Sequence, residues 1–137
     1  MDFSVNEADL ATLTKWDTPT ICNALELVCP ERRGYGFTTK HLFSLDPNLP
    51  PVCGFARTAT IRAALPSGES DAEMAKKRSA YYEYVAKAPG PTIAVIQDID
   101  SEPGIGAFWG EVQTNIHKGL GAVGAVTNGS FRDVPDS

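Results

Sequence analysis

Residues 92–133 read TIAVIQDIDSEPGIGAFWGEVQTNIHKGLGAVGAVTNGSFRD, and this stretch decides the fold. Its first five residues, 92–96, are continuously apolar, which is typical of a strand covered on both faces. A helical pattern follows over about 107–118. A second short apolar run at 122–126 predicts another buried strand. The order strand, helix, strand predicts a β-α-β unit and therefore an α/β fold with parallel strands.

The helix pattern and the strand ends locate the functional edge. Phe108, Val112 and Ile116 share one face of the expected helix, and Gly119 is expected to close it. In a parallel sheet the functional crevice lies at the carboxyl ends of the strands. Segments 97–106 and 127–133 should therefore emerge on the same edge.

The upstream sequence predicts scaffold elements. We expect two short helices within 4–29, a loop region over 31–53 with one short strand near 42–45, a strand at 54–62 and a helix at about 71–88. Three helix starts carry capping signals, namely Ser4 with Glu7, Thr18 with Pro19, and Ser70 with Glu73. The second helix should bury one face, formed by Ile21, Ala24, Leu25 and Val28.

Length and composition indicate a single domain spanning residues 1–137, with a sheet and active-site core at 54–133. The formal net charge of -5 argues against a nucleic-acid surface or an anionic-membrane surface, since both require a basic footprint. No apolar run approaches the ~18 residues of a membrane span. Three cysteines without a C-x-x-C pair indicate neither a disulfide framework nor a zinc site, so we expect a cytoplasmic protein.

Four features converge on the expected edge. The loop containing Gly104 and Gly106 permits close backbone approach, and the helix start after it offers N–H groups to a carboxylate or phosphate. Arg132 is able to pair with a carboxylate or stabilise an oxyanion. Asp133 is a hard oxygen donor suited to Mg²⁺ or Mn²⁺, with Glu111 as a possible second carboxylate. The combination predicts metal-assisted chemistry on a small acid.

The spacing of these residues resembles a known signature. Glu111, twenty residues, Arg132–Asp133, two residues and Asp136 is similar to the D-x20-R-D-x2-E/D pattern of the RraA-like family. That family includes the 4-hydroxy-4-methyl-2-oxoglutarate / 4-carboxy-4-hydroxy-2-oxoadipate aldolases. The text around 108–112 and 121–133 is similar as well, and weaker similarity extends upstream.

The resemblance implies a layered α/β/β-type domain and a class II pyruvate aldolase that uses Mg²⁺ or Mn²⁺, with oxaloacetate decarboxylation as a side activity. Asp133 would bind the metal, and Arg132 would bind the keto oxygen and stabilise the pyruvate enolate. Backbone amides around Gly110, Glu111 and Val112 would hold the carboxylate of the 2-oxo acid substrate. The carboxylate of Glu111 would order water and take part in proton transfer.

Two departures from the family pattern qualify these roles. Position 111 is Glu where the signature has Asp, so its carboxylate reaches one methylene further. The sequence ends four residues after Asp133, whereas family members continue with elements that complete the sheet and supply a carboxylate to a neighbouring subunit. We therefore expect a truncated chain with its C-terminal elements missing. The resemblance also implies a homotrimer or homohexamer.

Other functions remain open. Gly104 and Gly106 resemble a dinucleotide loop weakly, because Gly110 comes one residue late for G-x-G-x-x-G. A non-enzymatic regulator is the main alternative, since the family's namesake inhibits a ribonuclease, and a different enzyme chemistry on this scaffold is a third. Among the remaining polar residues, His117 is expected near the surface at a helix C-terminus. Asp98 and Asp100 end a strand at the expected edge; solvated loop acids are the main expectation, and a supporting position behind the site is the alternative.

Overall fold

A computed structural model describes residues 4–134 of the chain. They belong to two compact units, Met1–Val52 and Cys53–Ser137, which are described separately below. Within the described part, no helix is long and apolar enough to cross a membrane.

The first unit contains three short helical segments. They are α1 (Glu7–Leu13), α2 (Thr18–Val28) and a 3-10 turn, η1 (Pro30–Arg32). Residues 33–52 form turns and irregular structure, so the short strand expected near 42–45 was wrong. That segment has apolar residues, but none of the strands in the described residues pairs with it.

Both helix starts in this unit lie one or two residues from the expected positions. The side chain of Asn6 accepts from Asp9 N–H at 3.1 Å, and Asn6 N–H donates to the Asp9 carboxylate at 3.0 Å. This capping box replaces the expected Ser4 and Glu7 pair. Helix α2 is capped by Asp17, which accepts from Thr20 N–H at 2.9 Å. A carboxylate accepts a hydrogen bond with its full charge, so Asp17 takes the cap in place of Thr18.

The expected buried face of α2 was wrong for the described chain. Helix α2 has no buried residue among its eleven, and Val28 is 74% exposed. The i, i+3, i+4, i+7 spacing is present, but spacing predicts amphipathicity and not the surface that covers it.

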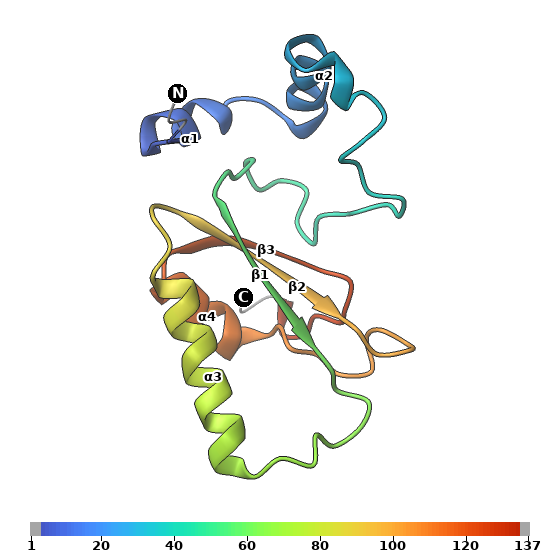
Figure 1. The fold of residues 1–137 in the computed structure, drawn as a ribbon, viewed down its shortest axis with the longest axis vertical. Coiled ribbons are helices and arrows are strands. Elements are labelled where there is room, and N and C mark those ends of the chain that lie inside the picture. The colour runs from blue at the N-terminus through green and yellow to red at the C-terminus, as the bar shows by residue number, and fades with distance from the viewer. Residues whose placement is uncertain (1–3, 135–137) are drawn as a thin grey trace. The chain divides into compact units, whose positions relative to one another are not determined.

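The second unit is built on a three-stranded parallel sheet (Figure 1). Its strands are β1 (Phe55–Ile61), β2 (Thr92–Asp98) and β3 (Ala122–Thr127), paired in the order β1-β2-β3. Helix α3 (Asp71–Ala86) connects β1 to β2, and α4 (Glu111–Gly119) connects β2 to β3. The α/β class and the predicted β-α-β unit are therefore confirmed.

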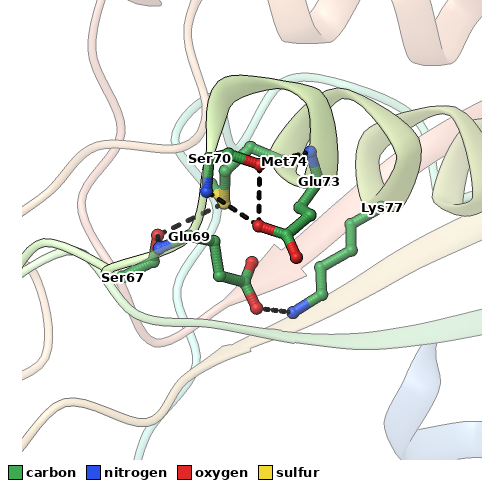
Figure 2. Close-up of polar contacts among 6 residues, drawn as sticks. All are labelled: Ser67, Glu69, Ser70, Glu73, Met74 and Lys77. Carbon is green, nitrogen blue, oxygen red and sulfur yellow. Dashed lines mark hydrogen bonds and ion pairs between the residues drawn. The ribbon is translucent and has the colours of Figure 1, made fainter.

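The predicted capping box at the start of α3 is confirmed (Figure 2). Ser70 N–H donates to the Glu73 carboxylate at 2.9 Å, and the Ser70 side chain accepts from Glu73 N–H at 3.4 Å. The Ser70 side chain and N–H lower the pKa of Glu73. An ion pair between Glu69 and Lys77 lies beside the cap. These contacts fix where the helix begins.

The core lies between the sheet and its two helices. Ala94, Ile96 and Trp109 are fully buried, and they pack against the partly buried side chains of Ala59, Ile61, Tyr81, Phe108 and Phe131. The opposite face of β2 is only half-buried at Ile93 and Val95, so complete burial of both faces was wrong. Alternating burial follows from helices covering one face of the sheet in the described chain.

Helix α4 begins later than the apolar spacing predicts. The segment before Glu111 is not helical, because Trp109 forms a parallel bridge with Phe131 and Gly110 is fully extended. The end of the helix also shifts. The left-handed glycine that follows it is Gly121, with a φ of 89°, while Gly119 is still helical.

Candidate functional site

One short pairing between distant segments forms the candidate site. After β3, the chain runs parallel to the segment before α4 through the bridge between Trp109 and Phe131. Arg132 N–H then donates to the carbonyl oxygen of Trp109 at 3.1 Å. This backbone bond sets Arg132 and Asp133 beside Gly110, the residue that caps α4.

Gly110 lies in close contact with both side chains. A methyl group at this position would lie 2.8 Å from Oδ2 of Asp133, 3.0 Å from Cγ of Arg132 and 3.2 Å from its Nε. The absence of a side chain is therefore what allows the carboxylate and the guanidinium to approach the helix start. Sequence reasoning assigned Gly110 only a backbone role.

Arg132 and Asp133 form an exposed ion pair. Nε of Arg132 lies 3.5 Å from Oδ2 of Asp133, and the two side chains are 71% and 46% exposed. Asp133 has a φ of 56°, a left-handed conformation that costs most residues about 1 kcal/mol or more. Asp136, the last residue of the signature, lies outside the described residues.

Glu111 and Val112 lie in the first turn of α4. Thr114 N–H donates to Gly110 O at 3.0 Å, so the N–H groups of residues 111–113 have no acceptor within the helix. Gly110, the N-cap residue, has no side chain that could cap them. The side chains of Glu111 and Val112 are exposed. This helix start has the chemistry of an anion site, with partial positive charge and outward N–H groups.

The donor set determines which metal suits the site. Within residues 4–134, no group of three or more His, Cys, Asp or Glu side chains is arranged to hold a metal. A preformed zinc or calcium cage is therefore not a feature of the described chain. Mg²⁺ is commonly held by one or two carboxylates, with water and substrate oxygens completing its shell. The exposed carboxylate of Asp133 fits Mg²⁺ coordination of this kind, with a single protein ligand.

Asp98 was wrongly expected to be a solvated loop acid. It is the last residue of β2 and is only 2% exposed. Its carboxylate accepts N–H bonds from Gly104 at 2.8 Å and from Asp100 at 3.0 Å. These two donors lower its pKa. Its position at a strand end, six residues before a glycine, was the available signal for a loop-anchoring carboxylate.

Asp100 also anchors backbone rather than facing solvent freely. Its Oδ2 accepts from Ala63 N–H at 2.7 Å and from Ala64 N–H at 2.8 Å. Gly106 lies directly against Ala63, since a methyl group at Gly106 would lie 2.2 Å from the Ala63 side chain. The loop containing Gly106 is therefore packed against the residues that follow β1. This packing argues against the dinucleotide alternative, because the loop would have to leave room for a phosphate.

His117 lies in the last turn of α4, as expected, but its expected position at the surface was wrong. It is 2% exposed and lies in an aromatic cluster, with its ring centroid 4.6 Å from that of Trp109 and 5.6 Å from that of Tyr81. Its Nδ1 lies 2.6 Å from Gln113 O, which accepts only, so Nδ1 carries the proton. Nε2 then accepts from Tyr81 O–H at 2.8 Å.

Burial determines the ionisation of this pair. Desolvation lowers the pKa of His117, although the hydrogen bond to Gln113 O opposes that effect. Burial, with Tyr82 and Tyr84 nearby, raises the pKa of Tyr81 to about 12. Sequence reasoning missed this pair because Tyr81 and His117 are 36 residues apart and on different helices.

A comparison with known protein families gives a match over most of the chain. A family model described as RraA-like, Aldolase/RraA, matches residues 18–137. The chain belongs to the RraA-like family. This family covers both aldolases and RraA-type regulators without enzymatic activity. No curated protein and no solved structure matches the sequence.

Proposed function

We propose that this RraA-like protein is a divalent-metal-dependent class II pyruvate aldolase. Its substrate would be 4-hydroxy-4-methyl-2-oxoglutarate or a related 4-hydroxy-2-oxo acid, cleaved to pyruvate and a second oxo acid. The observation that supports this proposal is the approach of Arg132 and Asp133 to Gly110 at the start of α4. A guanidinium, a carboxylate and helix N–H groups then surround one small region.

Each group suits one part of a 2-oxo acid. The N–H groups of residues 111 and 112 would bind the substrate carboxylate, because the helix leaves them without internal acceptors. The guanidinium of Arg132 would donate to the keto oxygen. Asp133 would hold Mg²⁺ or Mn²⁺, which would supply Lewis-acid polarisation of the 2-oxo acid oxygens.

The cleavage needs one proton removed and one added. A base takes the proton of the 4-hydroxyl, the C3–C4 bond breaks, and its electron pair forms the enolate of pyruvate. Arg132 stabilises the negative charge that develops on the enolate oxygen, and a proton delivered to C3 completes pyruvate. Glu111, at the same helix start, is the candidate for ordering water and moving these protons. Loss of CO₂ from oxaloacetate gives the same enolate, which predicts the side activity.

The test is pyruvate release from both substrates, with and without a chelator. We expect metal-dependent turnover that falls by about 100-fold or more in Asp133→Ala and in Arg132→Ala, as for loss of a main electrostatic contact. Arg33→Ala is the matched control, because Arg33 also forms an exposed ion pair, with Glu26 in the first unit. Chelator-resistant turnover, or full activity in Asp133→Ala, would refute the mechanism. Absence of turnover with both substrates would favour the regulator function.

The proposal also covers the oligomeric state of the protein, its location and the charge of its substrate. We propose a homotrimer or homohexamer in the cytoplasm that binds a small anionic substrate. Sedimentation of the purified protein tests the assembly directly.

A further inference from the structure

The buried residue Asp98, which is not one of the proposed reacting groups, links the end of β2 to the end of β3. Asp98 closes β2, and both of its carboxylate oxygens accept backbone N–H bonds from the loop that follows, from Asp100 at 3.0 Å and from Gly104 at 2.8 Å. A buried carboxylate held by two N–H donors is strongly oriented, since losing either bond leaves charge without a partner.

The backbone of Asp98 is held from the other strand. Asp98 N–H donates to Oδ1 of Asn128 at 2.8 Å, and Nδ2 of Asn128 donates to Asp98 O at 3.0 Å. Asn128 therefore continues the β2–β3 ladder with its side chain, just past the end of β3. Gly129 packs beside it, where a methyl group would lie 3.4 Å from Cβ of Asp98.

Gly104 lies between the two segments and joins them. Its N–H donates to Asp98, and its carbonyl accepts the Ser130 hydroxyl at 2.6 Å. Gly104 has a φ of 100°, and a methyl group there would lie 2.9 Å from Oγ of Ser130. Gly104 therefore joins the loop after β2 to Asp98 through its N–H and to Ser130 through its carbonyl oxygen.

We call the linked residues Asp98, Gly104 and Ser130 the clamp, and one residue, Phe131, separates it from Arg132 of the candidate site. After Ser130, Phe131 bridges to Trp109, Arg132 N–H donates to Trp109 O, and Asp133 meets Gly110. We propose that Asp98 is a positioning residue for this site. Its carboxylate fixes Gly104, Gly104 fixes Ser130, and Ser130 sets where Arg132 and Asp133 lie against the start of α4. The catalytic consequence rests on the proposed function, whereas the positional consequence does not.

The test compares two isosteric changes, each at a carboxylate that accepts two backbone N–H bonds. Asp98→Asn keeps the size but loses the charge and turns an amide group toward one N–H donor. Asp100→Asn is the matched control, since Asp100 also accepts two backbone N–H bonds, from Ala63 and Ala64 in the chain after β1. Hydrogen exchange of residues 128–133 reports the position of the segment without any assay of activity.

We expect Asp98→Asn to speed exchange over 128–133 by about tenfold and to weaken Mn²⁺ affinity, measured by calorimetry, by about tenfold, as for loss of an orienting partner. We expect kcat for pyruvate release to fall by a similar factor, with a smaller change in KM. Asp100→Asn should change each of these by less than about twofold while speeding exchange at 63–64. Equal acceleration over 128–133 in both variants, or none in Asp98→Asn, would overturn the inference.

Two further results keep the outcomes separate. If Asp98→Asn does not fold, Ser130→Ala removes one bond of the same clamp and should still speed exchange at 131–133; unchanged exchange there overturns the inference. If the wild-type chain releases no pyruvate with metal, the proposed function fails, and the exchange comparison still decides the positioning role. If the wild type is active and Asp98→Asn retains its kcat and Mn²⁺ affinity, positioning is refuted.

Discussion

The sharpest perturbation of the candidate site is Gly110→Ala. The added methyl group would lie 2.8 Å from Oδ2 of Asp133, whereas ordinary contacts begin near 3.4 Å, so the carboxylate must retreat by about 0.6 Å. Arg132 must also shift, since its Cγ would lie at 3.0 Å. Misplacement of a reacting group by 1 Å costs about 100-fold in rate, so we expect a loss of about tenfold in kcat/KM.

The same substitution should leave the fold largely intact. Gly110 is a helix cap with an extended backbone, a conformation open to alanine, and the atoms in conflict belong to the exposed side chains of Arg132 and Asp133. The free energy of unfolding should therefore change by about 1 kcal/mol or less. Thermal unfolding measures this change in parallel with the rate of pyruvate release and the affinity for Mn²⁺.

Gly119→Ala is the matched control for Gly110→Ala. Gly119 is the last residue of the same helix, and no atom would lie within 4 Å of an added methyl group. Its variant should keep full activity and full metal affinity. If Gly110→Ala also keeps both, Asp133 and Arg132 do not act from the position described, and the site must be sought elsewhere.

Three other substitutions have predicted effects on the free energy of unfolding. Ser70→Ala removes the cap of α3 and should cost about 1 kcal/mol of unfolding free energy, measured by urea denaturation. Gly121→Ala should cost about 1–2 kcal/mol because Gly121 has a φ of 89°, whereas Gly119→Ala should be neutral or stabilising by up to about 1 kcal/mol; equal effects would contradict the helix end described. Because the pKa of His117 is lowered in the folded state, the unfolded chain takes up its proton first. Stability should therefore fall as pH drops below about 6.5 toward the folded pKa, and His117→Gln should remove that slope in unfolding curves collected between pH 7 and 5.

The sequence was sufficient for the elements whose signal is local. Apolar runs at 92–96 and 122–126 predicted both strands, and the Ser70 cap predicted the start of α3. The start of α4 was missed because Phe108 continues the helical period of Val112. A parallel bridge from Trp109 to Phe131 outweighs that preference, and the partner strand segment is 22 residues away in the sequence. Pairing between distant segments does not produce a periodic pattern in the local sequence.

The residues in and around the candidate site also differ in how far the sequence could predict them. Arg132 and Asp133 were proposed because they are adjacent and their spacing from Glu111 resembles the signature of the RraA-like family. Asp98 and His117 were assigned to solvent, since a single acid or histidine has no pattern that reports burial. Their partners are Gly104 and Asn128 for Asp98, and Tyr81 for His117. Only the fold brings these groups together.

Trp109 couples the stability of the core to the geometry of the site. Its side chain packs with Ile96 and against His117, its carbonyl oxygen accepts Arg132 N–H, and its neighbour Gly110 receives Asp133. We therefore expect a change that loosens the aromatic cluster also to weaken the bond between Arg132 N–H and Trp109 O. Protonation of His117 at acid pH should consequently weaken substrate turnover together with stability, through the same contact. In the proposed arrangement Asp98 acts on the same segment from its other end, through Gly104 and Ser130.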